Sequence, residues 1–124
     1  MELEKIDPCC TVKPDLKSRP LLTEDQAMAL ERTFKILANS TRLRILHALF
    51  LSEEICVSEL AEILAMKPTA VSNQLQRLTF SGIIESRRDG NQIYYRVVDP
   101  CVVELLDSAW CLTEDAEVRV RKRK

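Results

Sequence analysis

The chain has 124 residues, 46% of them hydrophobic and 30% charged, with a formal net charge of −1. This size and composition fit one globular domain, and so small a monomer gains stability by pairing, which favours a homodimer. No apolar run approaches the roughly 20 residues that cross a bilayer, and the first residues are charged and proline-containing where a secretion signal needs an apolar run. We therefore expect a cytoplasmic protein with no membrane partner.

Enzymes are disfavoured by what the chain offers for catalysis. It has one histidine and two glycines, and it contains neither a phosphate-binding loop nor a His-Glu-x-x-His motif. These residues do not assemble an active site, so we expect a protein that is not an enzyme.

Charge is distributed unevenly along the chain. Five of the six residues in 119–124 are basic, and residues 67–96 carry a local excess of positive charge although the whole protein is slightly acidic. The basic middle predicts a face that meets a polyanion. The basic end, residues 119–124, is predicted to be disordered, with nonspecific phosphate contacts as the alternative.

The predicted elements begin after a proline-containing arm. Residues 1–22 hold the adjacent Cys9 and Cys10 among three prolines, which makes a long helix there improbable. Thr23 is a helix N-cap ahead of an apolar pattern that predicts a helix over 24–38. Asn39-Ser40 then ends this helix and caps a second one, whose apolar face includes Leu46 and Leu49.

Two short helices follow and predict a helix-turn-helix. The first carries Val57 to Leu64, and the second opens at Pro68 and stops near Gly82, with about three residues between them. The outward side chains of the second helix are polar and mostly uncharged, which suits reading of base edges. The predicted DNA-binding residues in and before this helix are Lys67, Thr69, Ser72, Asn73, Gln74, Gln76 and Arg77.

A basic hairpin is predicted directly after the helix-turn-helix. Residues 83–88 and 92–98 flank Asp89-Gly90, a dipeptide that favours a tight two-residue turn. Such a hairpin is a wing, whose side chains reach the DNA backbone. The wing residues predicted to bind DNA are Arg87, Arg88, Asn91 and Gln92.

Asp99-Pro100 starts a last helix that is apolar over most of its surface, up to Trp110. A terminal helix of this kind needs a second copy to cover it. The fold class is therefore predicted as mainly α with a β-hairpin wing, a homodimeric winged helix-turn-helix. The predicted divisions are an arm over 1–22, a DNA-binding and dimerisation domain over 23–115, and a tail over 116–124.

Several strings in the expected order resemble the ArsR/SmtB family of winged-helix metalloregulatory repressors. They are 37–46 (LANSTRLRIL), 55–61 (ICVSELA), 70–75 (AVSNQL) and 90–95 (GNQIYY), within a match over about 24–112. The resemblance implies a homodimer that represses transcription on double-stranded operator DNA and releases it when a toxic metal or metalloid binds. Two recognition helices one helical turn apart predict an imperfect inverted repeat.

Five cysteines in a reducing compartment favour metal binding or thiol chemistry over a disulfide framework, with buried apolar packing as the alternative for each. Cys56 lies where the family has the first thiol of its "CVC" element, and Ser58 replaces the second. Cys9 and Cys10 on the arm supply two more, as in some arsenite sensors of the family. Three thiolates favour As(III) or Sb(III), then Cd(II) or Pb(II), with Zn(II) less favoured because it normally takes a fourth ligand.

A second site is the lesser possibility. Cys101 and Cys111 lie near positions where zinc-sensing family members hold ligands, but the pattern departs from theirs at Leu112, and packing at the dimer interface is the alternative. The single His47 is interpreted as a packed or surface residue. A thiol-redox or persulfide sensor on the same scaffold, or a DNA-binding module without an inducer, stays open as an alternative function.

Overall fold

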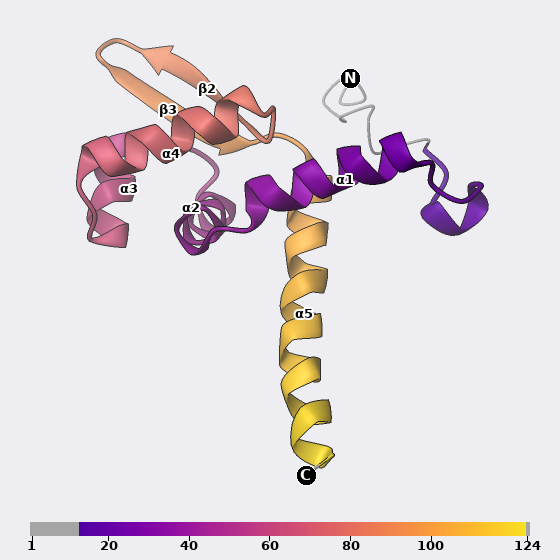
Figure 1. The fold of residues 1–124 in the computed structure, drawn as a ribbon. Coiled ribbons are helices and arrows are strands. Elements are labelled where there is room, and N and C mark those ends of the chain that lie inside the picture. The colour runs from indigo at the N-terminus through magenta and orange to yellow at the C-terminus, as the bar shows by residue number, and fades with distance from the viewer. Residues whose placement is uncertain (1–12, 124) are drawn as a thin grey trace, which may run out of the picture.

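The structure is a computed structural model that describes residues 13–123. Within that range the chain forms five α-helices, a short 3-10 turn and a three-stranded sheet (Figure 1). The elements are η3 (Leu16–Ser18), α1 (Glu24–Leu37), α2 (Ser40–Leu51), β1 (Ile55–Cys56), α3 (Val57–Leu64), α4 (Pro68–Phe80), β2 (Ile84–Asp89), β3 (Gln92–Val97) and α5 (Pro100–Lys122).

The helix boundaries follow from caps that the sequence displays. Thr23 and Gln26 form a capping box at the start of α1, and the Asn39 side chain accepts a hydrogen bond from the backbone N–H of Arg42 to open α2. Pro68 occupies the first turn of α4. The Asp99 side chain caps α5. The predicted helix over 24–38 is confirmed to within one residue.

The core lies between α2, α3, α4 and the sheet. Its fully buried side chains come from the apolar faces of these three helices and from β2: Ile45, Leu46, Leu60, Val71, Leu75, Leu78 and Ile84. These contacts set α3 and α4 against each other, and the hairpin β2–β3 lies along the body next to α4 (Figure 1). The winged helix-turn-helix fold is confirmed.

The sheet contains a strand that the sequence did not reveal. Its order is β1-β3-β2, all antiparallel, with Cys56 opposite Tyr94 in the β1–β3 pair. Asp89 pairs with Gln92, so the two-residue turn is Gly90-Asn91, one position later than expected. Gly90 has φ +65, a conformation that glycine adopts without a Cβ clash, and this places it inside the turn.

The predicted disorder of the basic end is wrong as far as Lys122, because α5 runs unbroken to that residue. The predicted division of the chain at residue 116 stays a prediction. Ion pairs one turn apart join Asp115 to Arg119 and Glu117 to Arg121, and they offset repulsion among the basic residues of this segment. None of the residues of α5 is buried, and α5 projects away from the winged body while α1 extends to one side (Figure 1). No helix within residues 13–123 has the length and apolar character that a membrane crossing requires.

Candidate DNA interface and thiol sites

The turn between α3 and α4 is tight because Ala65 adopts a left-handed conformation, with φ 55 and ψ 47. Its backbone N–H bonds back to the carbonyl of Ala61, which ends α3, and Lys67 then leads into α4. Leu60, Leu75 and the other buried residues hold the inner faces of both helices. The outer face of α4 is consequently presented to solvent as a rigid surface.

The predicted reading residues lie on that surface with two exceptions. Five of them are exposed, and Ser72 and Gln74 are half-buried. Gln74 is turned toward α2, where its Oε1 accepts a hydrogen bond of 2.8 Å from Nε of Arg42. Arg42 was not among the predicted site residues, because its position on α2 indicates only a polar face. The exposed five are Lys67, Thr69, Asn73, Gln76 and Arg77.

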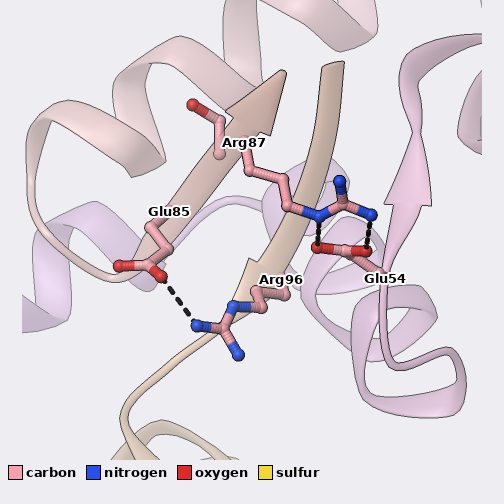
Figure 2. Close-up of a pocket in the computed structure, with 5 residues that line it drawn as sticks. Glu54, Glu85, Arg87 and Arg96 are labelled. Atoms are coloured by element: carbon pink, nitrogen blue, oxygen red, sulfur yellow. Dashed lines mark hydrogen bonds and ion pairs between the residues drawn. The ribbon is translucent and has the colours of Figure 1, made fainter. Parts of the chain in front are cut away.

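In the wing, Arg87 is held by a carboxylate outside the hairpin. Its Nε and one terminal nitrogen each lie 2.7 Å from the two oxygens of Glu54, a bidentate pair that crosses from β2 to the segment before β1 (Figure 2). The guanidinium also lies 5.1 Å from the ring centroid of Tyr94. The hydrogen bond from Arg87 lowers the pKa of Glu54, and Glu54 raises the pKa of Arg87.

The arginines of the wing differ in whether a carboxylate holds them. Arg96 bonds Glu85 at 2.9 Å across the β2–β3 ladder, so it too has an acidic partner (Figure 2). Arg88, Asn91 and Gln92 are exposed at the end of the hairpin. Arg88 is thus the wing arginine best placed to meet a phosphate, and Arg87 is engaged in holding the wing to the body.

Cys56 is buried at the start of α3, with 5% of its surface exposed. Its Sγ lies 3.3 Å from the hydroxyl of Ser58 and 3.3 Å from Oε1 of Glu59, to which it donates. The backbone N–H of Cys56 also donates to Glu59 at 3.4 Å. Cys56 therefore acts as the cap of α3, and an ion that took this sulfur would have to displace these bonds.

The two cysteines of α5 lie apart on one helix. Cys101 is in the first turn, and Cys111 is ten positions later, about 15 Å along the axis at ~1.5 Å rise per residue. Cys111 is exposed and carries a free thiol, whereas Cys101 is disulfide-bonded. The charge of Asp115, together with a 3.6 Å hydrogen bond from the thiol, raises the pKa of Cys111.

No metal-binding group of three or more side chains assembles within residues 13–123. Cys9 and Cys10 lie outside the described residues, so the structure does not test their contact with Cys56. Cys56 and Cys111 are both free thiols within one subunit. A three-sulfur site would accordingly need thiols from residues 1–12 or from a second subunit.

An apolar groove runs between α2 and α5. It is lined by Leu43, His47, Phe50, Leu106 and Trp110, among others, and Trp110 is 63% exposed. His47 lies exposed at its edge. On α1, Phe34 is likewise half exposed, at 49%. The two terminal helices therefore show large apolar side chains that the subunit itself does not cover.

α3 and α4 form a helix-turn-helix, and the outer face of α4 is polar. A two-stranded wing follows it, so the class of protein is a winged helix-turn-helix protein. The family model described as "Bacterial regulatory protein, arsR family" matches residues 39–86. The AntR antimony-specific transcriptional repressor, a solved structure, is 52% identical with a TM-score of 0.73, covering 87% of this chain and 97% of that one. The chain belongs to the arsR family.

Two further comparisons agree. The cadmium resistance regulatory protein CadC of Listeria innocua serovar 6a is 34% identical over 74 residues, which is 60% of this chain and 62% of that protein. The chain therefore matches less than two thirds of that relative's length. A homodimeric winged helix-turn-helix DNA-binding domain from Mycobacterium bovis has a TM-score of 0.66 and 31% identity, covering 79% of this chain and 93% of that domain.

Proposed function

We propose that this protein is a homodimeric transcriptional repressor that binds operator DNA and releases it when a thiophilic ion binds its cysteines. The observation that carries the proposal is the 52% identity to an antimony-specific repressor over 97% of that protein's length, in a chain with five cysteines. As(III) and Sb(III) are the favoured inducers, and Cd(II), Pb(II) and Zn(II) follow. The operator is double-stranded DNA with an imperfect inverted repeat.

Dimerisation is supported by the terminal helices. α5 has no buried residue, and both α1 and α5 expose large apolar side chains such as Phe34 and Trp110. The matched Mycobacterium bovis domain is homodimeric. Pairing of two subunits through these helices would cover the exposed faces and set two α4 helices at a fixed spacing.

DNA binding is assigned to α4 and the end of the wing. The exposed polar side chains of α4 suit base edges, and Lys67, Arg77 and Arg88 suit phosphates. The net charge of −1 does not oppose this, because residues 67–96 carry a local excess of positive charge.

The inducer site is proposed first on Cys9, Cys10 and Cys56, in which two arm thiols join the thiol at the start of α3. Three sulfurs suit the trigonal pyramid of As(III) or Sb(III), and Zn(II) normally takes a fourth ligand. An ion bound at Cys56 would disturb the cap of α3 and hence the packing of α4 against α3. The burial of Cys56 and its bonds to Ser58 and Glu59 oppose this site.

Cys101 and Cys111 are the second, less favoured candidate: the thiol of Cys111 is exposed, but Cys101 is disulfide-bonded and must be reduced before its sulfur can bind an ion. Leu106 is midway between them, so an antiparallel α5 centred there would bring Cys101 of one subunit beside Cys111 of the partner subunit. An ion bound by these two sulfurs needs a third ligand, which Cys9 or Cys10 would provide. An ion in this position would act on the dimer interface and not on α3.

X-ray absorption on the reduced protein loaded with arsenite, and separately with antimonite, tests both sites. We expect three sulfur neighbours in the wild type and fewer in Cys9→Ser. Loss of a sulfur neighbour in Cys56→Ser assigns the ion to the first site, and loss of one in Cys111→Ser assigns it to the second. The matched functional measurement is release of operator DNA by arsenite under reduction, which a redox sensor would not show. Undiminished release by every cysteine variant would contradict the proposal.

A further inference from the structure

Arg42 occupies a junction between three helices. Its backbone N–H donates to the Asn39 side chain at 3.0 Å, and its Nη1 donates to the carbonyl of Ile36 in the last turn of α1, also at 3.0 Å. Its Nε donates to Oε1 of Gln74 on α4 at 2.8 Å. The guanidinium is thus held by α1 on one side and holds a residue of α4 on the other.

The orientation of the Gln74 amide follows from the chemistry of its partner. Arginine carries only donors, so the atom that faces Nε must be the amide oxygen, and the NH₂ group must point the other way. A free glutamine presents both an acceptor and two donors. In this structure the amide oxygen of Gln74 is turned toward Arg42, so the group that faces away from Arg42 is the NH₂ donor.

The bases distinguish these two states of a glutamine. A bidentate contact to adenine needs both the acceptor and the donor, because adenine offers N7 as an acceptor and N6 as a donor. A group that only donates instead meets the acceptors of guanine, O6 and N7, or O4 of thymine, whereas at adenine the single acceptor N7 lies beside the N6 amino group, which also donates. Half-burial of Gln74 beside Arg42 further limits the rotamers from which it can choose.

We propose, building on the proposed function of α4 as the DNA-reading helix, that Arg42 is a positioning residue for base recognition. It fixes Gln74 as a donor-only group, and the half-site position that Gln74 meets therefore prefers guanine or thymine. Because Arg42 also bonds the end of α1, the orientation of this group is tied to a helix of the dimer face.

The first test reverses the polarity of the contact while Arg42 stays in place. The wild-type dimer selects its half-site from a randomised duplex library without any inducer ion, and binding is then measured to every single base-pair substitution. In Gln74→Glu, Arg42 holds one carboxylate oxygen and the other faces DNA as an acceptor. We expect the preferred base at one position to change from guanine or thymine to cytosine or adenine, whose amino groups donate.

The second test removes the positioning residue. In Arg42→Ala the amide rotates freely, and we expect discrimination at that same position to fall about tenfold while the other positions keep their preferences. Arg44→Ala is the matched control, because Arg44 is an exposed arginine of the same helix. It should leave the preference at every base position unchanged. Thermal melting of each variant separates this readout from a loss of folding.

The donor-only role of Gln74 and the positioning role of Arg42 are refuted by different results. A wild-type preference for adenine at the position that depends on Gln74, or a Gln74→Glu variant with every preference unchanged, would refute the donor-only role. Wild-type preferences retained in folded Arg42→Ala would refute the positioning role. Failure of the wild type to select any sequence would instead overturn the proposed function, and failure of arsenite to release DNA would leave the role of Arg42 unaffected.

Discussion

At the scale of single residues, the functional groups are distinguished by their partners more than by their type. Arg87 and Arg88 are adjacent in sequence and equal in charge, yet Arg87 is bound by Glu54 and Arg88 is at the exposed end of the wing. Cys56 and Cys111 are both free thiols, yet one caps a helix and the other is exposed beside Asp115. Sequence spacing identifies these residues as candidates but does not show what each side chain contacts.

The Cys111 thiol should become more reactive when Asp115 is neutralised. The Asp115 carboxylate raises the pKa of the thiol, so Asp115→Asn lowers that pKa and increases the thiolate fraction at pH 7 to 8. We expect faster alkylation of Cys111 by iodoacetamide, followed by peptide-resolved mass spectrometry. Glu117→Gln removes a carboxylate that pairs with Arg121 and should leave the rate unchanged. Equal rates in the two variants would contradict this assignment.

At the scale of elements, the contacts between segments decide how α4 and the wing are presented. Ala65 shapes the turn between α3 and α4, and the Glu54–Arg87 pair joins the wing to the segment before β1. β1 itself is only two residues long, and it exists because β3 offers it a partner strand. Such contacts are invisible to periodicity, which detects elements with a repeating apolar face.

Ala65→Gly should stabilise the protein by about 0.5–1 kcal/mol. A left-handed conformation costs a residue with a Cβ roughly 1–2 kcal/mol, and the greater freedom of glycine in the unfolded chain offsets part of the gain. Chemical denaturation measures the change in the free energy of unfolding. Ala70→Gly, at an exposed position inside α4, is the control and should destabilise by about 1 kcal/mol. A destabilised Ala65→Gly variant would show that the turn is not strained.

Glu54→Gln should release Arg87 to interact with DNA, because it removes the two 2.7 Å bonds and leaves the longer, 3.8 Å pair with Asp89. A freed guanidinium adds one phosphate contact for each wing, so the slope of log K against log salt should become steeper by about one unit per subunit. Anisotropy with a labelled duplex at several salt concentrations measures the slope. Glu53→Gln removes the same charge from the exposed neighbouring residue and should not change the slope. Matching slopes in the two variants would mean that Arg87 does not reach DNA even when it is freed.

At the scale of the whole molecule, the body and the two terminal helices have different roles. α2, α3, α4 and the sheet share one buried core, whereas α5 has no buried residue. The body is therefore stabilised within one subunit, and we expect the exposed apolar faces of α1 and α5 to be covered by a second subunit. An inducer ion would then act either on α3 through Cys56 or on the dimer face through α5.

Trp110→Glu should weaken the dimer. Trp110 is 63% exposed in the single subunit, and a charge placed in an apolar interface raises the dissociation constant by roughly thirtyfold or more, corresponding to about 2 kcal/mol for a central aromatic residue. Sedimentation velocity across a concentration series measures the shift from dimer to monomer. Ser108→Glu adds the same charge to an exposed polar position of α5 and should change the equilibrium much less. Equal dissociation of both variants would place Trp110 outside the interface.

Sequence by itself determined the order of helices, the helix-turn-helix and the hairpin, because caps such as Thr23 and Asn39 and apolar repeats such as Val71, Leu75 and Leu78 are local signals. It also identified the family and all of the exposed residues proposed to bind DNA. Tertiary structure alone decided what those side chains are bound to. Arg42 reaches Gln74 across 32 positions and Glu54 reaches Arg87 across 33, and no local pattern encodes contacts over such separations. The chain must fold before either pair exists.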